Sequence, residues 1–200
     1  MNYTFEYRSL SETLYDALVD DAFYITMEGS VSGTPGQRRE AMRRYYDFSM
    51  QEARKYGRLV TPDGRAFGAA IWTRPVYGDL AGQMSNEKKT FIRDHMGAAS
   101  LETYKRITAS MARQTATVVP PAGWYLSIVG IAPPFQGQGL GETLVRPVLD
   151  RTDDYGVHTY LETFTPRNMR FYERLGFQEA GSFDEPVTRA RYWVMVRQPS

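Results

Sequence analysis

Hydrophobic and polar residues follow two different periods along the first 73 residues, and these periods predict the order of the elements. Aromatic and polar residues alternate in NYTFEYR (2–8), which predicts a first strand. Apolar residues then recur at helical spacing in SETLYDALVDDAF (11–23). A loop rich in glycine, serine and proline precedes a charged amphipathic helix that ends at Gly57. The Pro-Asp-Gly turn within RLVTPDGRAFGAAIWT (58–73) predicts a β-hairpin.

The rest of the chain alternates helical patterns with apolar, strand-like runs. WYLSIVGI (124–131) is the most apolar of these runs and is typical of a fully buried strand. No internal repeat or linker divides the chain, so we expect one domain over residues 1–200. The predicted elements are helices over 85–96, 101–116 and 166–176, and strands over 124–131, 157–163 and 190–197.

Composition and charge narrow the classes of function. The chain has 200 residues, of which 42% are hydrophobic, enough to bury a core. It has 24 basic and 23 acidic residues, so nothing in the net charge of +1 favours nucleic acid as a partner. The N-terminus lacks the pattern of a signal peptide, and no apolar stretch approaches the roughly 18 residues that span a bilayer. We therefore expect a cytoplasmic protein without membrane contact, and the sequence leaves a homodimer open.

The chain contains no cysteine and only two histidines, which lie far apart. The lack of cysteine excludes disulfides, thiolate nucleophiles and cysteine metal sites. Two histidines that lie far apart in sequence give little support for a Ser-His-Asp hydrolase or for a histidine-rich metal centre, and we expect no metal site.

A glycine-rich segment follows the apolar strand. PPFQGQGLGETLVRPVLD (133–150) carries glycines at alternate positions, 137, 139 and 141, immediately before an apolar-periodic run. A strand, a glycine turn and a helix N-terminus together form an anion site, because the first-turn N–H groups have no intrahelical partner and the helix dipole favours negative charge. The alternative is a tight turn without a ligand. Three glycines favour a phosphate cradle.

Two common phosphate motifs do not fit this segment. The nucleotide P-loop needs lysine after its last glycine, but Glu142 follows Gly141 and no lysine occurs between 106 and 200. The dinucleotide fingerprint G-x-G-x-x-G needs glycine where Glu142 stands, and its loop normally belongs to the first βαβ unit.

The pattern that does match is Q-x-x-G-x-G, formed by Gln136, Gly139 and Gly141. With this pattern the sequence resembles the GNAT superfamily of acetyl-CoA-dependent N-acetyltransferases, whose pyrophosphate-binding loop has the form [Q/R]-x-x-G-x-[G/A]. PRNMRFYERLGF (166–177) is similar to the second signature of that superfamily. Within the superfamily, the chain resembles the puromycin N-acetyltransferase type.

The clear resemblance covers about residues 66–74 and 124–198. It implies an α/β (α+β) fold of the GNAT type, in which a mixed, mostly antiparallel, twisted sheet of about seven strands is flanked by helices. A V-shaped splay is expected between the strands over 124–131 and 157–163. The helical patterns at about 74–120 are then read as an insertion.

The resemblance also implies which residues bind acetyl-CoA. Backbone groups of Val129 and Ile131 would hold the pantetheine arm, and Asn168 would contact the cofactor near it. The loop led by Gln136 would hold the pyrophosphate through backbone amides. The loop residues concerned are Gly137, Gln138, Gly139, Leu140, Gly141 and Glu142.

Direct acetyl transfer from a thioester to an amine needs two groups that handle protons and no covalent enzyme intermediate. Tyr172 is the candidate acid for the departing thiolate, since a phenol with a pKa of about 10 is protonated at neutral pH. A role in packing its helix on the sheet is the alternative. Glu162, at the end of a strand, is the candidate base or ammonium anchor, with a surface carboxylate as the alternative. Asp20, Asp21 and Glu28 could also bind an amine or form a solvated helix end.

The expected acceptor is a primary amine of a small molecule, such as an aminonucleoside or another xenobiotic, because a neutral chain offers no general attraction to basic protein tails. Aromatic side chains of Tyr24, Trp72 and Trp124 could line its pocket or belong to the core. Two other functions stay open, a non-catalytic CoA-binding module and a protein N-acetyltransferase.

Overall fold

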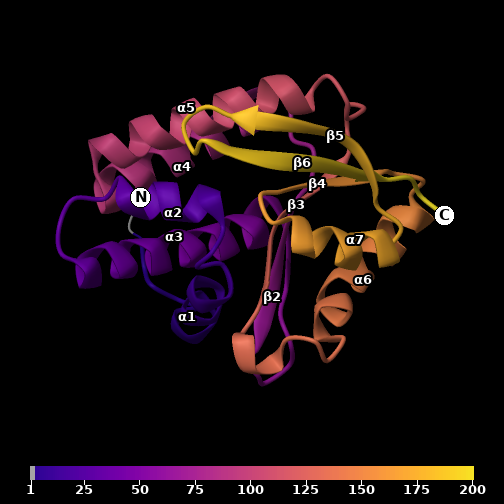
Figure 1. Cartoon of the computed structure of the whole chain (residues 1–200), viewed down its shortest axis with the longest axis horizontal. Helices are drawn as coiled ribbons and strands as arrows, with labels where there is room; N and C mark the ends of the chain where they lie inside the picture. Colours follow the sequence, from indigo (N-terminus) through magenta and orange to yellow (C-terminus); the bar gives the residue numbers. More distant parts are fainter. Residues whose placement is uncertain (1–2) are drawn as a thin grey trace.

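The computed structural model describes residues 3–200, and a mixed six-stranded sheet runs through its middle (Figure 1). The strand order is β1-β2-β3-β4-β6-β5. Every neighbouring pair is antiparallel except β3 and β4, which are parallel. The strands are β1 (Gly57–Val60), β2 (Gly68–Thr73), β3 (Trp124–Ile131), β4 (Thr159–Thr163), β5 (Gln178–Glu185) and β6 (Ala190–Arg197).

Seven α-helices surround this sheet in the described part of the chain. Short 3₁₀ turns, η1 (Pro133–Phe135) and η2 (Pro166–Asn168), precede the last two of them. The helices are α1 (Arg8–Ala17), α2 (Ala22–Gly29), α3 (Pro35–Tyr56), α4 (Gly78–Met96), α5 (Ala98–Thr115), α6 (Leu140–Asp154) and α7 (Met169–Arg174).

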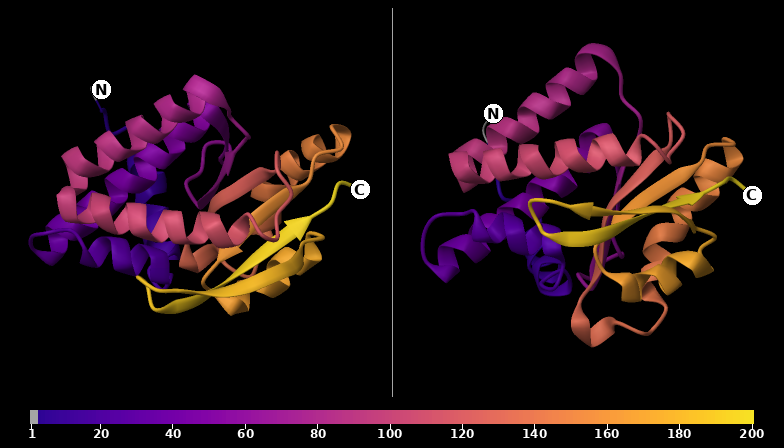
Figure 2. Two further views of the ribbon diagram at one scale, coloured as in Figure 1. Left: turned by 90° about the horizontal axis from the view of Figure 1, so that it is seen from above. Right: turned by 45° about the horizontal axis from the view of Figure 1, so that its top comes forward.

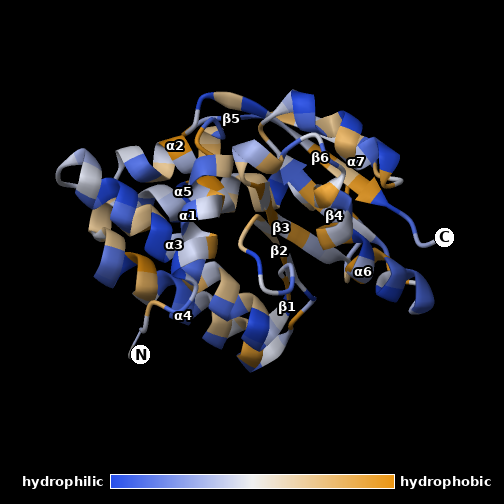
Figure 3. Cartoon of the chain, turned by 90° about the horizontal axis from the view of Figure 1, so that it is seen from below, coloured by the Kyte–Doolittle hydropathy of each residue, from blue (hydrophilic) through white to orange (hydrophobic). Residues whose placement is uncertain are grey.

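The two faces of the sheet carry different helices (Figures 1 and 2). On one face, residues of β2 and β3 such as Ile71 and Ile128 pack against α1 to α4. On the other, Leu126 and Leu161 pack against α6 and α7. Helix α5 covers the inner face of β6 through Ile107. Figure 3 shows the same division by hydropathy, with hydrophobic residues along the central strands and hydrophilic ones on the outer helix surfaces.

The predicted mixed, mostly antiparallel sheet is confirmed, with six strands in the described residues where about seven were expected. The hairpin of β1 and β2, the strands β3 and β6 and the helical character of most of 74–120 agree with the sequence patterns. The polar edge strand β5 had no apolar run to reveal it. That residues 74–120 are an insertion stays a prediction.

The expected first strand is wrong over residues 3–7, which form no sheet pairing; Asn2 lies outside the described residues. The buried carboxylate of Asp47 on α3 accepts the backbone N–H groups of Glu6, at 3.0 Å, and of Tyr7. Gln51, one turn further along α3, donates to the carbonyl of Thr4 at 2.7 Å. The backbone of this segment is therefore satisfied by helix side chains instead of a neighbouring strand.

The helix expected over 11–23 is two helices, α1 and α2, separated by residues 18–21. The carboxylate of Asp21 caps α2 by accepting the N–H of Phe23 at 2.9 Å. An aspartate in extended conformation starts a new helix and so ends the preceding one. This break positions a carboxylate beside the cavity described next.

Candidate active site

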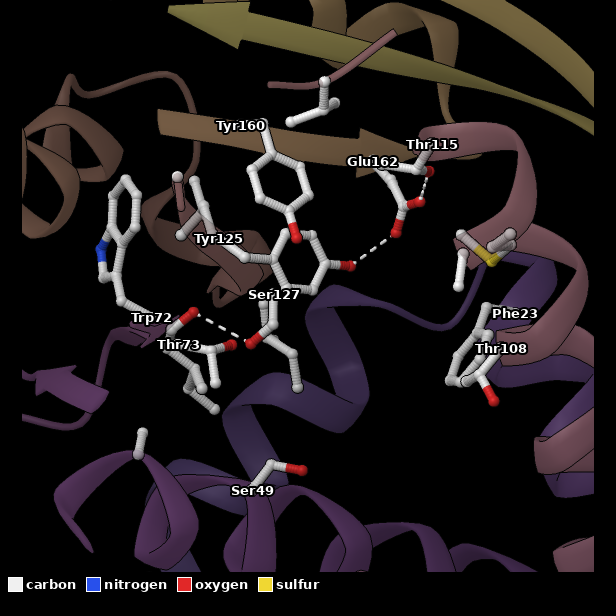
Figure 4. Close-up of a pocket in the computed structure, with 18 of the residues that line it drawn as sticks. Phe23, Ser49, Trp72, Thr73, Thr108, Thr115, Tyr125, Ser127, Tyr160 and Glu162 are labelled. Atoms are coloured by element: carbon white, nitrogen blue, oxygen red, sulfur yellow. Dashed lines mark hydrogen bonds between the residues drawn. The ribbon is translucent and has the colours of Figure 1, made fainter. Parts of the chain in front are cut away.

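A cavity of about 790 Å³ opens where β3 and β4 separate (Figure 4). The two strands pair only from Trp124 with Thr159 to Leu126 with Leu161. Beyond this point β3 continues to Ile131 without β4 beside it. This is the V-shaped splay that the resemblance implied.

A β-bulge at Ser127 decides which backbone groups face the splay. Ile71 of β2 is paired with Ile128, and the next residue, Trp72, is paired with Leu126, so Ser127 is an extra residue in β3. Its hydroxyl donates to the carbonyl of Ile71 at 3.1 Å. An extra residue shifts the alternation of the strand by one position.

The shift turns Val129 and Ile131 toward the splay. The N–H of Ala132 donates to Phe67 at 2.8 Å, toward β2, so alternation directs the backbone groups of Ile131 and Val129 to the other side. On that side β4 is absent at this level. These are the two residues that the resemblance assigned to the pantetheine arm.

The glycine loop enters α6 with left-handed backbone. Gly137 and Gly139 have φ angles of 76° and 77°, and Gly139 is the N-cap of α6. The N–H groups of Gly139, Leu140 and Gly141 donate to no acceptor within residues 3–200. Free amides at a helix start, with bare backbone around them, fit a phosphate group.

Two glutamines of the loop have structural contacts. The side chain of Gln136 donates to the carbonyl of Ile131 at 2.8 Å, and that of Gln138 donates to Pro134 at 3.1 Å. Glu142 forms an ion pair of 2.5 Å with Arg146. Gln136 thus fixes the loop against the end of β3, a role that the sequence pattern did not specify.

Tyr172 and Asn168 both line the cavity from the side of α7. Tyr172 is only 7% exposed, and burial, followed by the charge of Asp21, raises the pKa of its phenol well above the usual value. The hydroxyl is therefore protonated throughout the physiological range. The ring also contacts Phe171 and Phe177, so Tyr172 has the packing role as well.

Glu162 projects from β4 into the same cavity (Figure 4). Tyr125 of β3 donates to one carboxylate oxygen at 2.9 Å, and Thr115 of α5 donates to the other. Burial raises the pKa of Glu162, while these two hydrogen bonds lower it. Glu162 is not a solvated surface carboxylate, and its two donors come from elements far apart in sequence.

Comparison with known proteins agrees with this geometry. The family model described as "Acetyltransferase (GNAT) family" matches residues 40–177. The chain belongs to the GNAT acetyltransferase family. A Schizosaccharomyces pombe relative, the uncharacterized N-acetyltransferase C550.08, is 31% identical over 78 residues, which are 38% of this chain. The chain covers only 32% of the length of that relative.

Two solved structures share the fold over nearly the whole chain. One, from Corynebacterium glutamicum, is described as histone acetyltransferase HPA2 and related acetyltransferase; its TM-score is 0.65 at 19% identity, with 97% of this chain and 91% of that chain covered. The other is arylalkylamine N-acetyltransferase 2 from Aedes aegypti, with a TM-score of 0.61 at 15% identity and coverage of 97% and 94%. At these identities the likeness concerns the fold.

Of the three aromatic residues expected in the acceptor pocket of this GNAT domain, Tyr24 lines the cavity. Trp72 is also part of the wall, but its side chain is fully buried in the cluster beneath α6. Trp124 is not among the lining residues; it packs against that same cluster because side chains alternate along β3, and Tyr125 faces the cavity instead. The expectation for Trp124 is therefore wrong.

Several cavity residues of the GNAT domain escaped the sequence patterns. Thr115 and Tyr125 hold Glu162, and Lys88 of α4 pairs with Glu52 of α3 at 3.2 Å at another part of the wall. Only Tyr125 had a signal, namely its position one residue away from Trp124 in an alternating strand.

Within residues 3–200, no group of three or more metal-ligating side chains could hold a metal ion. No helix in that range has the length and hydropathy to cross a membrane.

Proposed function

We propose that this GNAT domain transfers an acetyl group from acetyl-CoA directly to the primary amine of a small molecule. The observation that carries this proposal is the single cavity that extends from Val129 and Asn168 to Tyr172 and Glu162. Part of the proposed cofactor site and two groups that can handle protons therefore line one cavity, as direct transfer requires.

The residues of the chain fit acetyl-CoA. The free N–H groups of Gly139, Leu140 and Gly141 would hold the pyrophosphate, and the backbone of Val129 and Ile131 would bind the pantetheine arm as a neighbouring strand would. Acetyl-CoA, when bound, supplies an activated acetyl thioester. The loop needs no side-chain cation for this, since a helix N-terminus and backbone amides already favour an anion.

Glu162 and Tyr172 divide the proton handling. As the C–N bond forms and the C–S bond breaks, the carboxylate of Glu162 takes the proton of the amine, directly or through water. The hydroxyl of Tyr172 donates to the sulfur on which charge develops. Because burial raises the pKa of Tyr172 far above the thiol value of about 8.5, this hydroxyl stabilises the thiolate mainly as a hydrogen-bond donor.

The lining of the cavity supports a small acceptor. Aromatic rings of Phe23, Tyr24, Tyr45, Tyr104 and Tyr125 line part of the cavity of about 790 Å³, a volume that a small acceptor would share with the thioester end of the cofactor. The Aedes structure of the same fold is named for arylalkylamines, which are small amines that carry an aromatic ring. Aminonucleosides of the puromycin type belong to the same size class and are included as acceptors to be tested.

Two measurements test the proposal. Calorimetry with acetyl-CoA and desulfo-CoA should show binding to the chain, and no binding at millimolar ligand would contradict the cofactor assignment. A thiol-release assay over arylalkylamines, polyamines, puromycin and lysine peptides should show preference for small amines. Binding without transfer to any amine would indicate a CoA-binding module, and preference for peptides would indicate a protein N-acetyltransferase. The cytoplasmic location and the homodimer stay predictions.

A further inference from the structure

Two adjacent carboxylates in the turn between α1 and α2 have different surroundings. Asp20 points outward and forms an ion pair of 3.5 Å with Arg167, in which the two side chains are 73% and 69% exposed. Asp21 is partly buried and lines the cavity. The break between the helices therefore places one carboxylate at the surface and the next one inside.

The charge of Asp21 has no cationic partner. Its carboxylate accepts the backbone N–H groups of Phe23, at 2.9 Å, and of Tyr24 as the cap of α2. No lysine, arginine or side-chain hydroxyl of residues 3–200 donates to it. Burying a carboxylate without a cation costs free energy, and a carboxylate with a perturbed pKa that lines a cavity is a candidate for binding a charged ligand.

The groups around Asp21 come from three helices. Burial raises the pKa values of the phenols of Tyr24 on α2, Tyr46 on α3 and Tyr172 on α7, and the nearby charge of Asp21 raises them further. Burial raises the pKa of Asp21 to about 6, so the group is mainly ionised at pH 7.5. Tyr172, the residue assigned to the reacting sulfur, lines the same cavity as Asp21.

The remaining charges of the cavity do not compensate Asp21. Among the residues that line it, Lys88 is the one cationic side chain, and it is paired with Glu52 at 3.2 Å. Glu162 is held by two hydroxyls and adds a further negative charge. Carboxylates thus outnumber cationic groups in the cavity, and aromatic side chains form much of its wall. These features suit a ligand that has a protonated amine attached to an apolar or aromatic group.

We propose that Asp21 binds the ammonium group of the acceptor, so that the site selects primary alkylamines that are protonated at neutral pH. This inference rests on the proposed function, because it assigns the acceptor to the same cavity. Asp21 accounts for affinity and selection of the charged amine, and Glu162 for its deprotonation. Both carboxylates line the same cavity, so one can hold the ammonium by its charge while the other takes the proton.

The variant Asp21→Asn tests the effect of the negative charge of Asp21 separately from its role as a helix cap. Asparagine is as good an N-cap as aspartate, so the start of α2 is preserved and only the negative charge is lost. Asp20→Asn is the matched control, since it removes the same charge one residue away, on the exposed side. Thermal melting of both variants confirms that they are folded.

Equilibrium binding of 2-phenylethylamine and of its neutral analogue 2-phenylethanol, measured by calorimetry without acetyl-CoA, tests the proposal. We expect the wild type and Asp20→Asn to bind the amine at least 10-fold more tightly than the alcohol at pH 7.5, and Asp21→Asn to lose this preference. At pH 5 the wild-type preference should shrink as Asp21 is protonated. An unchanged preference in Asp21→Asn, an equal loss in Asp20→Asn or no amine binding by the wild type would overturn the assignment.

A parallel thiol-release assay separates this inference from the proposed function. If the wild type binds the amine through Asp21 but transfers no acetyl group, the acetyltransferase proposal fails and the ammonium site stands. If Asp21→Asn transfers acetyl groups with the wild-type KM for 2-phenylethylamine, the ammonium site fails and the acetyltransferase proposal stands. A rise in KM for cationic amines with little change in kcat supports both.

Discussion

Tyr125 donates a hydrogen bond of 2.9 Å to Glu162, one position beyond the last pair that joins β3 to β4. The bond crosses the splay at its apex and, with the bond from Thr115, favours the charged form of a carboxylate whose pKa is raised by burial. The ionisation state of Glu162 therefore depends on a side chain of the neighbouring strand.

Tyr125→Phe removes this donor and keeps the ring. We expect the pKa of Glu162 to rise further, so the acidic limb of the pH profile of kcat/KM moves to higher pH, and kcat near neutrality falls on the order of 10-fold. Tyr160→Phe is the control, because the Tyr160 ring stacks on Tyr125 at 4.8 Å but donates no hydrogen bond to Glu162. An acidic limb that moves equally in both variants would contradict this role.

Glu162→Gln removes the proposed proton acceptor itself. An ammonium with a pKa near 10 is only about a thousandth neutral at pH 7, so the variant should lose most of its activity there and recover partly as the pH rises toward 9. Initial rates from pH 6 to 9.5 measure the effect. A profile parallel to that of the wild type would show that Glu162 does not take the proton.

Tyr172→Phe tests the donor to the sulfur. We expect kcat to fall on the order of 10²-fold, while the Kd of acetyl-CoA stays within about 2-fold, because only the hydroxyl is lost. No basic limb from Tyr172 should appear below pH 10 in the wild type, since burial raises its pKa far above the usual value. Turnover at the wild-type rate would mean that another group assists the thiolate.

Gly139→Ala tests the phosphate loop. Alanine at a φ of 77° is strained by about 1–2 kcal/mol, so the loop should relax and acetyl-CoA should bind at least 10-fold more weakly. Gly156→Ala is a matched control, because Gly156 has a φ of 63° and open space around a Cβ, but it follows the far end of α6. Both variants should lose stability and only the first should lose affinity, as measured by melting and calorimetry.

Asp21→Asn should also raise the free energy of unfolding near neutral pH. Folding raises the pKa of Asp21 from 3.8 to about 6, so the folded state binds the proton more tightly and stability falls as the pH rises through this range. Above pH 6 the charge costs up to roughly 2–3 kcal/mol, which asparagine avoids. We expect a higher Tm for the variant at pH 7.5 and no difference at pH 3.5. A lower Tm of the variant at both pH values would contradict the idea that the charge of Asp21 destabilises the fold.

The sequence predicted the elements whose pattern is local. The apolar run of β3 and the glycines at 137, 139 and 141 are sufficient to predict a strand and a loop that leads into a helix, because one face or one turn determines each of them. The residues of the acceptor site are different. Thr115 reaches Glu162 from 47 residues away, and neither residue has a signal before the helices are packed.

The wrong prediction for the first helix shows the same limit. Residues 11–23 have helical periodicity throughout, yet an aspartate that can cap a helix also ends the one before it. One continuous helix and two helices with a break between them both fit this periodicity, and the packing against the rest of the fold decides between them. Trp124 failed for a related reason, since the face of a strand that looks into the cavity is set by the neighbouring strands.

The separation of β3 from β4 has a consequence for self-association as well as for binding. Beyond Leu126, β3 has a free edge in the interior of the sheet, with backbone groups of Val129 and Ile131 left without a strand partner. Free edges usually recruit strands from other chains and so lead to aggregation. Here Val129 lines the cavity at the splay of β3 and β4, so this part of the edge faces a ligand site within the sheet and not the outer margin where another chain would add a strand.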